Sequence, residues 1–474
     1  MVKKIIVCLL VFLMFSPILA QTKWDKENSF KVQNKLLELG FDPKGVDGVW
    51  GKNSQKALDQ FFNIYQIEPS SEVELVLNIL EGIKEDDSHL DEVMTKKDAI
   101  RFEKRIGFGS PVDRVVRYIG LTRREAIDLV IDELKNYEDD FNWPEWTEGS
   151  IPIGFLTKVK STLVGKRCTN FPFKFSLQKA LLKSIIFSEN PQFEKLNIFW
   201  LDHFSVAWDS YNMPYSYVEH FKFIRTNSNK NFLELLKFSF TDPAMIKYLN
   251  NDQSLPKNPN ENLAREFLEL FSLGEGNYSE KDIREIAKML TGFSVNEASE
   301  KFQLIKEYRI NKNFKVFNNK IKNIEELIKI TEKHKKFGFF IAKKLYKEYV
   351  SLEEPDQKLL HQIVQKFRKH SFNISEMLRA ILSTKRFWDE DNKLTLVKSP
   401  IDLLIGTMRN LGHLGINSID NKSWDKFLKS SLFTLKTNNQ DLFDPPSIDG
   451  WPSGMEWLTG QKIEKRISST IKFF

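Results

Sequence analysis

Residues 260–274 read NENLAREFLELFSLG, and they combine a helix start with one apolar face. Leu263, Phe267 and Leu270 recur at three- and four-residue spacing, which places their side chains on one side of an α-helix. Asn260 precedes them and can cap the first turn with its side-chain oxygen. The same spacing recurs along most of the chain after residue 97, whereas the alternation typical of strands is scarce. The sequence therefore predicts a mostly α fold, with helices over residues 124–134, 177–187, 232–238, 262–271, 280–290, 337–349, 356–369 and 374–383.

The opposite side of this predicted helix is charged. Glu261, Arg265 and Glu269 are four residues apart, so their side chains should stack along one face. One interpretation is an ion-pair ladder, in which each exposed pair contributes only roughly 0.2–0.5 kcal/mol. The other is a polar cleft, in which one carboxylate is a general acid or base and Arg265 binds an anionic group of the substrate.

His203 is the candidate partner for these carboxylates. It lies in the run FWLDHF at residues 199–204, and aromatic neighbours of this kind favour a buried, structural imidazole. Beside Glu261 or Glu269, however, it would form an acid–base pair, so these three residues are the candidate catalytic residues. Weaker candidates of the same kind are Asp202, Arg225 and Asp282.

Residues 1–20 have the features of a secretory signal peptide. Two lysines precede an apolar run at 5–15, and Ala20 offers a cleavage site. The apolar run is shorter than the roughly 20 residues that a membrane-spanning helix needs, so no transmembrane anchor is expected after cleavage. The mature chain would be exported to the periplasm or cell envelope, and Cys168 would be its one thiol, which excludes an internal disulfide.

Residues 22–68 form a small first module, and residues 69–97 predict a partly helical linker rich in Glu, Asp and Ser. The module's distinctive residues are Val32, Gln33, Leu36, Leu39, Gly40, Phe41, Pro43, Val46, Asp47, Gly48, Trp50, Gly51, Ala57, Leu58 and Phe61. Through these residues the module resembles the peptidoglycan-binding domain family, a three-helix fold, and this resemblance implies noncatalytic binding of cell-wall glycopeptide. Asp47 and Trp50 are its candidate ligand-binding residues, although each could instead order the loop that contains it.

Residues 98–474 form a large helical domain that resembles an exported bacterial family of unknown function, DUF 1800. The family implies no activity, but its members suggest an exported partner protein. Where the family commonly has a His-Asp pair followed by glycine and lysine, this chain reads INKNFK at residues 310–315. The segments that carry the resemblance are 105–109, 199–204, 231–236, 242–245, 260–274, 278–282, 290–293, 341–345, 398–400 and 450–452, with Trp457.

Composition and motifs argue against several classes of function. The chain has 70 Lys and Arg against 64 Asp and Glu, with both signs interspersed, so nucleic-acid binding is not expected. The seven histidines show no spacing typical of a metal site. Phosphate-binding loops, dinucleotide fingerprints and nucleophile elbows are absent, so neither a metal nor a cofactor is predicted.

Two functions remain from the sequence. The first is an exported envelope protein that binds peptidoglycan and presents its helical domain to a polymer or protein partner. The alternative is a hydrolase or lyase that acts on cell-wall or exopolysaccharide material through a Glu/His acid–base pair.

Overall fold

The computed structural model describes residues 24–83, 86–148, 171–210, 213–411 and 420–473, which form two compact units that divide after Asp86. Residues 1–20, predicted as a signal peptide, and Cys168 lie outside the described residues. Helices make up most of both units, which confirms the predicted mostly α fold. No helix within the described ranges is both long and apolar enough to cross a membrane.

The first unit contains three helices, α2 (Lys26–Glu38), α3 (Lys52–Tyr65) and α4 (Val73–Gly82). Helix α2 buries Val32 and Leu36, and helix α3 buries Ala57, Leu58 and Phe61. Helix α4 comes from the segment predicted as a linker, yet its Val76 and Leu80 are fully buried and the helix packs on α2. This part of the predicted linker therefore belongs to the core of the first unit. The core consists of Val32, Leu36, Phe41, Ala57, Leu58, Phe61, Phe62, Val76 and Leu80.

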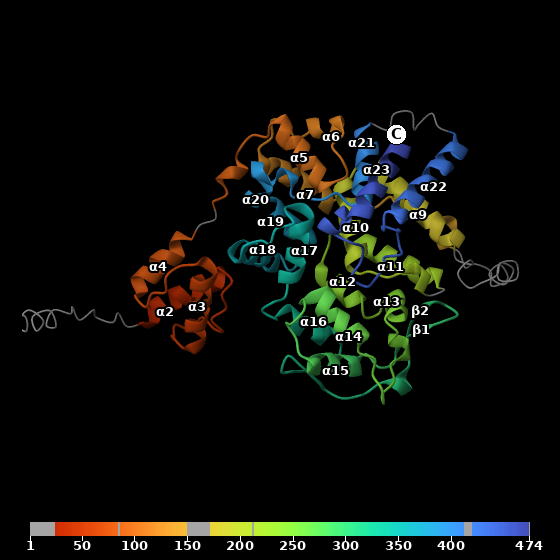
Figure 1. Ribbon diagram of the computed structural model, residues 1–474. Coiled ribbons are helices and arrows are strands. Elements are labelled where there is room, and N and C mark those ends of the chain that lie inside the picture. Colours follow the sequence, from red (N-terminus) through yellow and green to blue (C-terminus); the bar gives the residue numbers. More distant parts are fainter. Residues whose placement is uncertain (1–23, 84–85, 149–170, 211–212, 412–419, 474) are drawn as a thin grey trace, which may run out of the picture. The chain divides into compact units, whose positions relative to one another are not determined.

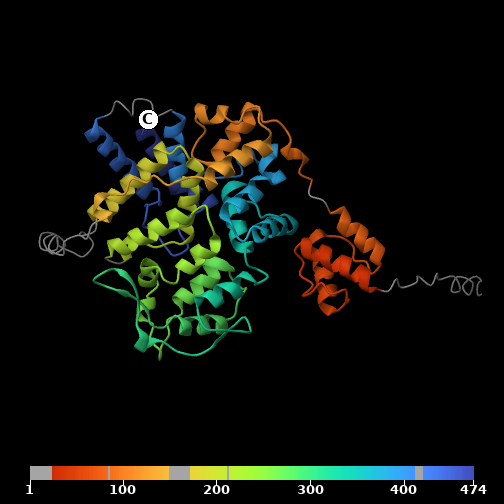
Figure 2. The same ribbon diagram turned by 180° about the vertical axis from the view of Figure 1, so that it is seen from behind.

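The second unit is organised around helix α10 (Pro191–His203), which lies in the middle of the unit in both views (Figures 1 and 2). Every residue of α10 except Asp202 is buried, because neighbouring helices cover the helix on all sides. Asp202 is therefore the most exposed position of α10. Helices that pack against α10 include α5 (Lys96–Ile106), α7 (Arg123–Lys135), α9 (Phe171–Phe187) and α11 (Pro214–Asn227).

Local sequence signals explain where many helices of this unit begin. Asp242 caps the helix that starts at Pro243, since its side chain accepts a hydrogen bond from the Ala244 N–H and proline suits the first helical position. Ser399 and Asp402 form a capping box, in which each side chain bonds the backbone N–H group of the other. The remaining helices are α6 (Val112–Val116), α12 (Phe232–Phe238), α13 (Pro243–Tyr248), α14 (Asn262–Glu266), α15 (Glu280–Met289), α16 (Ile324–Glu332), α17 (Phe339–Tyr349), α18 (Gln357–Lys369), α19 (Ile374–Leu382), α20 (Lys385–Trp388), α21 (Pro400–Asn410), α22 (Asn421–Thr437) and α23 (Gly460–Phe473).

Short elements complete the second unit. Two antiparallel hairpins follow α15; β1 (Phe293–Asn296) pairs with β2 (Lys301–Leu304), and β3 (Phe314–Val316) pairs with β4 (Asn319–Ile321). A π-helical turn, η5 (Phe267–Ser272), continues directly from α14. The 3₁₀ turns are η1 (Ser88–Leu90), η2 (Glu145–Thr147), η3 (Trp208–Ser210), η4 (Asn251–Gln253), η6 (Lys306–Tyr308), η7 (Glu390–Leu394) and η9 (Gly454–Leu458).

Candidate functional site

The predicted charged ladder is only partly formed. The Arg265 guanidinium donates two hydrogen bonds of 2.9 Å to Glu280, and its Nη2 lies 3.4 Å from Glu261. Glu269 does not join this cluster, because its carboxylate accepts a hydrogen bond from the Tyr278 hydroxyl. The helix widens from α to π geometry after Glu266, which moves Glu269 out of the four-residue register assumed from the sequence. Glu261, Arg265 and Glu280 thus form a partly exposed ion-pair cluster.

His203 is a buried structural residue, with 2% of its surface exposed. Its Nε2 lies 3.2 Å from the Phe271 carbonyl oxygen, and its Nδ1 lies 3.3 Å from Lys344 Nζ. Since a carbonyl only accepts, Nε2 carries the proton and Nδ1 accepts from the lysine. Burial, together with the charge of Lys344, holds the pKa of His203 well below its ordinary value, so the ring is neutral. Neither nitrogen bonds Glu261 or Glu269, and the structure does not bring the proposed acid–base pair together.

The weaker candidates have structural partners as well. Arg225 is fully buried and donates to both carboxylate oxygens of Glu194 at 2.6 and 2.8 Å, and also to Asp139. Asp282 forms the capping box at the start of α15. Asp202 is the one of these three residues that lines the cavity described below.

In the first unit, both predicted ligand-binding residues order the loop between α2 and α3. Asp47 Oδ1 accepts hydrogen bonds from the Val49 backbone N–H at 2.9 Å and from the Gln33 amide at 3.1 Å. The Trp50 ring stacks on Trp24, with 3.6 Å between the ring centroids. Asp47 is nevertheless exposed and Trp50 partly exposed, so contact of either residue with a ligand stays a prediction.

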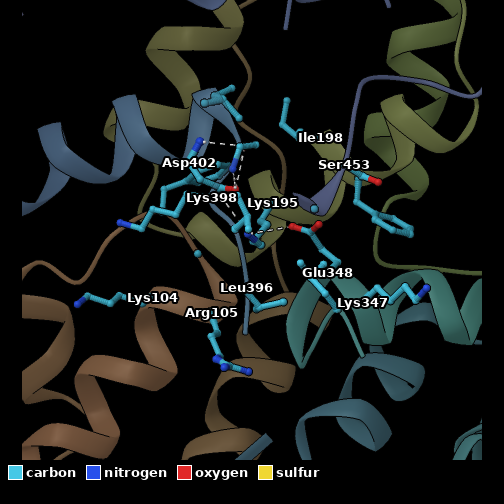
Figure 3. Close-up of a pocket in the computed structure, with 18 of the residues that line it drawn as sticks. Lys104, Arg105, Lys195, Ile198, Lys347, Glu348, Leu396, Lys398, Asp402 and Ser453 are labelled. Atoms are coloured by element: carbon cyan, nitrogen blue, oxygen red, sulfur yellow. Dashed lines mark hydrogen bonds and ion pairs between the residues drawn. The ribbon is translucent and has the colours of Figure 1, made fainter. Parts of the chain in front are cut away.

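Five segments that are distant in sequence enclose a cavity of about 530 Å³ in the second unit (Figure 3). They are helix α5 with the turn at 107–109, helix α10, helix α17, residues 396–402, and residues 451–457. Leu352, Glu390 and Gln440 complete the lining. Gly109 permits the turn at 107–109 to pack closely on α21. A Cβ atom at Gly109, which has a φ of +80°, would lie 2.5 Å from the Gly406 carbonyl oxygen of α21. The cavity that these five segments enclose is called the basic cavity below.

A buried lysine links two walls of the basic cavity. Lys195 Nζ from α10 lies 3.0 Å from Glu348 Oε1 of α17 and 3.1 Å from Asp402 Oδ1 of α21, as Figure 3 shows. Burial opposes ionisation of Asp402, but the charge of Lys195 and hydrogen bonds from Ser399 hold the pKa of its carboxyl below the ordinary value. Burial raises the pKa of Glu348, and the negative charge of Asp402 adds to this effect. One cation is thus shared between two acids, and the three side chains fix the relative positions of three helices.

Arg105 closes the side of the basic cavity below α17. Its guanidinium donates to the carbonyl oxygens of Tyr349 and Val350 at the C-terminal end of α17, and to that of Asn392. Burial and the charges of Arg101 and Arg386 lower the pKa of Arg105 to about 10. The donors of Arg105 are therefore committed to the fold.

Asp202 and Lys344 lie on another part of the lining. Asp202 Oδ1 accepts a hydrogen bond of 2.6 Å from the Trp451 backbone N–H, next to Gly450, which has a φ of +97°. Burial raises the pKa of Asp202 to about 6, although Lys344 and the Trp451 N–H oppose the change. Burial lowers the pKa of Lys344, and the negative charge of Asp202 only partly offsets this shift. The buried Trp451 and Trp457 line the same cavity.

The lining of the basic cavity has an excess of positive charge. Eight Lys and Arg side chains contribute to it, against five Asp and Glu. Lys104 and Lys398 are exposed, and neither ammonium group has an ion pair or hydrogen bond within the described part of the chain. Partial burial lowers the pKa of Lys398; the negative charge of Asp402 opposes this shift, and the positive charge of Lys104 adds to it. An anion between these two lysines would relieve their repulsion.

The residues of the basic cavity were largely missed by reasoning from sequence. Lys195, Glu348 and Asp402 lie in ordinary amphipathic helices, and nothing in their spacing marks them. The available signal was that all five cavity segments overlap motifs that carry the family resemblance, such as 105–109 and 398–400. Among the described residues, no group of three or more His, Cys, Asp or Glu side chains is placed to hold a metal ion.

Comparison with known proteins gives one match. A family model described as a protein of unknown function, DUF1800, matches residues 39–474. No curated protein and no solved structure matches the chain.

Proposed function

Because the chain belongs to the DUF1800 family, whose description assigns no activity, we propose its function from its own residues. The protein is an exported component of the cell envelope. Its first unit binds peptidoglycan, and its second unit binds an anionic group of a small molecule or polymer end in the basic cavity.

One observation carries the second part of this proposal: among the described residues, neither Lys104 nor Lys398 has an ion-pair partner, and both line a cavity of about 530 Å³. Other cationic groups around them are already neutralised, as Lys195 is by Asp402, or committed to backbone carbonyls, as Arg105 is. A carboxylate or phosphate would supply the missing counter-charge. The size of the cavity suits a ligand of a few sugar or organic-acid units.

The first part rests on the resemblance of the first unit to peptidoglycan-binding domains. The loop between α2 and α3 is rigid, since the Gln33 amide bonds the backbone of Asp47, Gly48 and Val49. A rigid loop with an accessible carboxylate and a stacked pair of indole rings, Trp24 and Trp50, supports binding of a glycopeptide.

Calorimetric titration of the mature protein tests the cavity. Glucuronate and inorganic phosphate should bind, whereas glucose, which has no charge, should not. The double variant Lys104→Ala/Lys398→Ala should bind glucuronate at least about tenfold more weakly, because one hydrogen bond to a charged group contributes about 1.5–3 kcal/mol. The control Lys320→Ala/Lys322→Ala removes the same charge from exposed residues outside the cavity lining. Equal affinities in the two double variants would overturn the proposal.

A pelleting assay with purified sacculi tests the first unit. The mature chain should pellet with sacculi, and a chain that lacks residues 22–86 should stay in solution. Failure of the mature chain to pellet would refute wall binding. Release of soluble muropeptides, lost on Glu261→Gln or Glu269→Gln, would instead support the hydrolase that the sequence offered as the alternative.

A further inference from the structure

Lys344 differs from Lys195 and Lys347, two other lysines that line the basic cavity. Its ammonium forms no ion pair within the described residues; its hydrogen-bond partner is the neutral ring of His203, at 3.3 Å. Lys195 and Lys347, by contrast, each face carboxylates at 2.6–3.1 Å. Burial of Lys344 favours its uncharged form, which is the form of an amine that reacts with carbonyl carbon.

The surroundings of Lys344 supply the other parts that such a reaction needs. The hydrogen bond to His203 Nδ1 uses one N–H of the amine, so the amine is positioned while its lone pair stays free. His203 is in turn fixed by the Phe271 carbonyl, which makes it a positioning residue. Asp202, on the same cavity lining, is an acid that holds a proton up to near neutral pH.

We infer that Lys344 forms a reversible Schiff base with a carbonyl ligand that also carries an anionic group, the chemistry shared by 2-oxo acids and the reducing ends of acidic sugars. The inference rests on the proposed anion binding, which would hold the ligand in the cavity by Lys104 and Lys398.

The chemistry balances without an oxidant or reductant. The neutral Lys344 Nζ attacks the carbonyl carbon, a C–N bond forms, and a proton passes from nitrogen to the former carbonyl oxygen to give a carbinolamine. The Asp202 carboxyl then donates its proton to the hydroxyl group, the C–O bond breaks, and water leaves. The product is a protonated imine and the Asp202 carboxylate, and hydrolysis reverses each step.

Reductive trapping tests this inference on the full mature chain. The protein is incubated with pyruvate or glucuronic acid and sodium cyanoborohydride, and the modified lysines are mapped by peptide mass spectrometry. Burial lowers the pKa of Lys344 and so raises its neutral fraction, and the hydrogen bond to His203 fixes the amine inside the cavity, so labelling at Lys344 should exceed labelling at exposed lysines. Trapping by pyruvate alone would identify a free oxo acid as the ligand class, and trapping by glucuronic acid alone an acidic sugar end.

Two variants serve as controls. Lys344→Arg should lose the site-specific adduct, whereas Lys347→Arg, one turn away on the same helix and also in the lining, should keep it. Labelling of the wild-type chain spread evenly over exposed lysines would refute the Schiff base, and this readout needs no variant to fold. If glucuronate still binds in calorimetry in that case, the proposed anion binding stands alone; if it does not bind, the proposed function fails as well.

Discussion

Replacement of Asp202 by Asn should stabilise the second unit at neutral pH. Burial raises the pKa of this carboxyl to about 6 from an ordinary value of 3.8, so at pH 7, where the carboxyl is mostly ionised, its buried charge destabilises the folded protein relative to the unfolded chain. The difference is about 2 pKa units, and one unit corresponds to about 1.4 kcal/mol, which gives an upper value of about 3 kcal/mol. Asp202 is partly exposed to the cavity, so we expect a gain of about 2 kcal/mol. Asparagine keeps an oxygen that can accept the hydrogen bond from the Trp451 N–H.

The gain should depend on pH in one direction. The unfolded chain releases the Asp202 proton near pH 4, whereas the folded chain retains it to about pH 6, so the wild-type protein loses stability between these values as the pH rises. The variant lacks this loss. Its advantage should therefore be absent below pH 4, grow from pH 4 to pH 6, and be complete at pH 7.

Urea denaturation at pH 4, 5.5 and 7 measures this difference. Eight of the ten tryptophans lie in the second unit, so fluorescence reports mainly on its unfolding. Asp420→Asn is the control, because Asp420 is an exposed helix cap of α22 whose role asparagine can fulfil, and it should show no such gain at pH 7. A variant no more stable than wild type at pH 7, or a gain that is the same at pH 4 and pH 7, would refute the burial of an acid at this position.

Three further predictions concern packing around the two candidate sites. Lys195→Met leaves Glu348 and Asp402 without their shared cation and should lower the free energy of unfolding by about 3 kcal/mol at pH 7. Lys347→Met breaks the ion pair with Glu354, whose side chains are 36% and 61% exposed, and should change the free energy of unfolding by less than about 1 kcal/mol. Equal losses for the two variants in urea denaturation would contradict the buried triad. Gly450→Ala would place a Cβ atom 2.2 Å from Asp202 Oδ1 at a φ of +97°, so it should destabilise the fold by about 2 kcal/mol or more and weaken glucuronate binding, and an unchanged melting temperature would argue against this close contact. Gln33→Leu removes the acceptor for two backbone N–H groups and should destabilise the first unit by about 2 kcal/mol, seen as faster hydrogen exchange at residues 47–49; unchanged exchange there would show that the loop is held by other contacts.

The helices of the second unit were predictable because apolar spacing and capping residues act locally. The helix at 232–238 has the predicted bounds, and Asp242 caps the next helix as its sequence indicated. The π-helical turn after Glu266 was not predictable, because one added residue in a turn leaves the apolar spacing almost unchanged while it moves Glu269 to a new neighbour. Local patterns therefore gave the helix but not the partners on its charged face.

The basic cavity depends on contacts that no local pattern contains. Lys195 meets Glu348 and Asp402 across 153 and 207 positions of sequence, so their association follows only from how the helices pack. Sequence did place His203 correctly among aromatic rings, and the structural interpretation of that residue fits its two hydrogen bonds. The His203 imidazole is hydrogen-bonded to Lys344 and not to Glu261 or Glu269, which were proposed as its partners.

The cavity is formed by five segments that are far apart in the sequence, so it forms late in folding. Its walls extend from residue 97 to residue 457, so no fragment of the second unit encloses it, and the pocket exists only after the most distant loops of the chain have closed. A ligand of this cavity therefore binds only chains whose second unit is folded, and it does not bind partly folded chains. By mass action it would then protect all five wall segments from proteases together, so that occupancy of the cavity would prolong the lifetime of correctly folded chains.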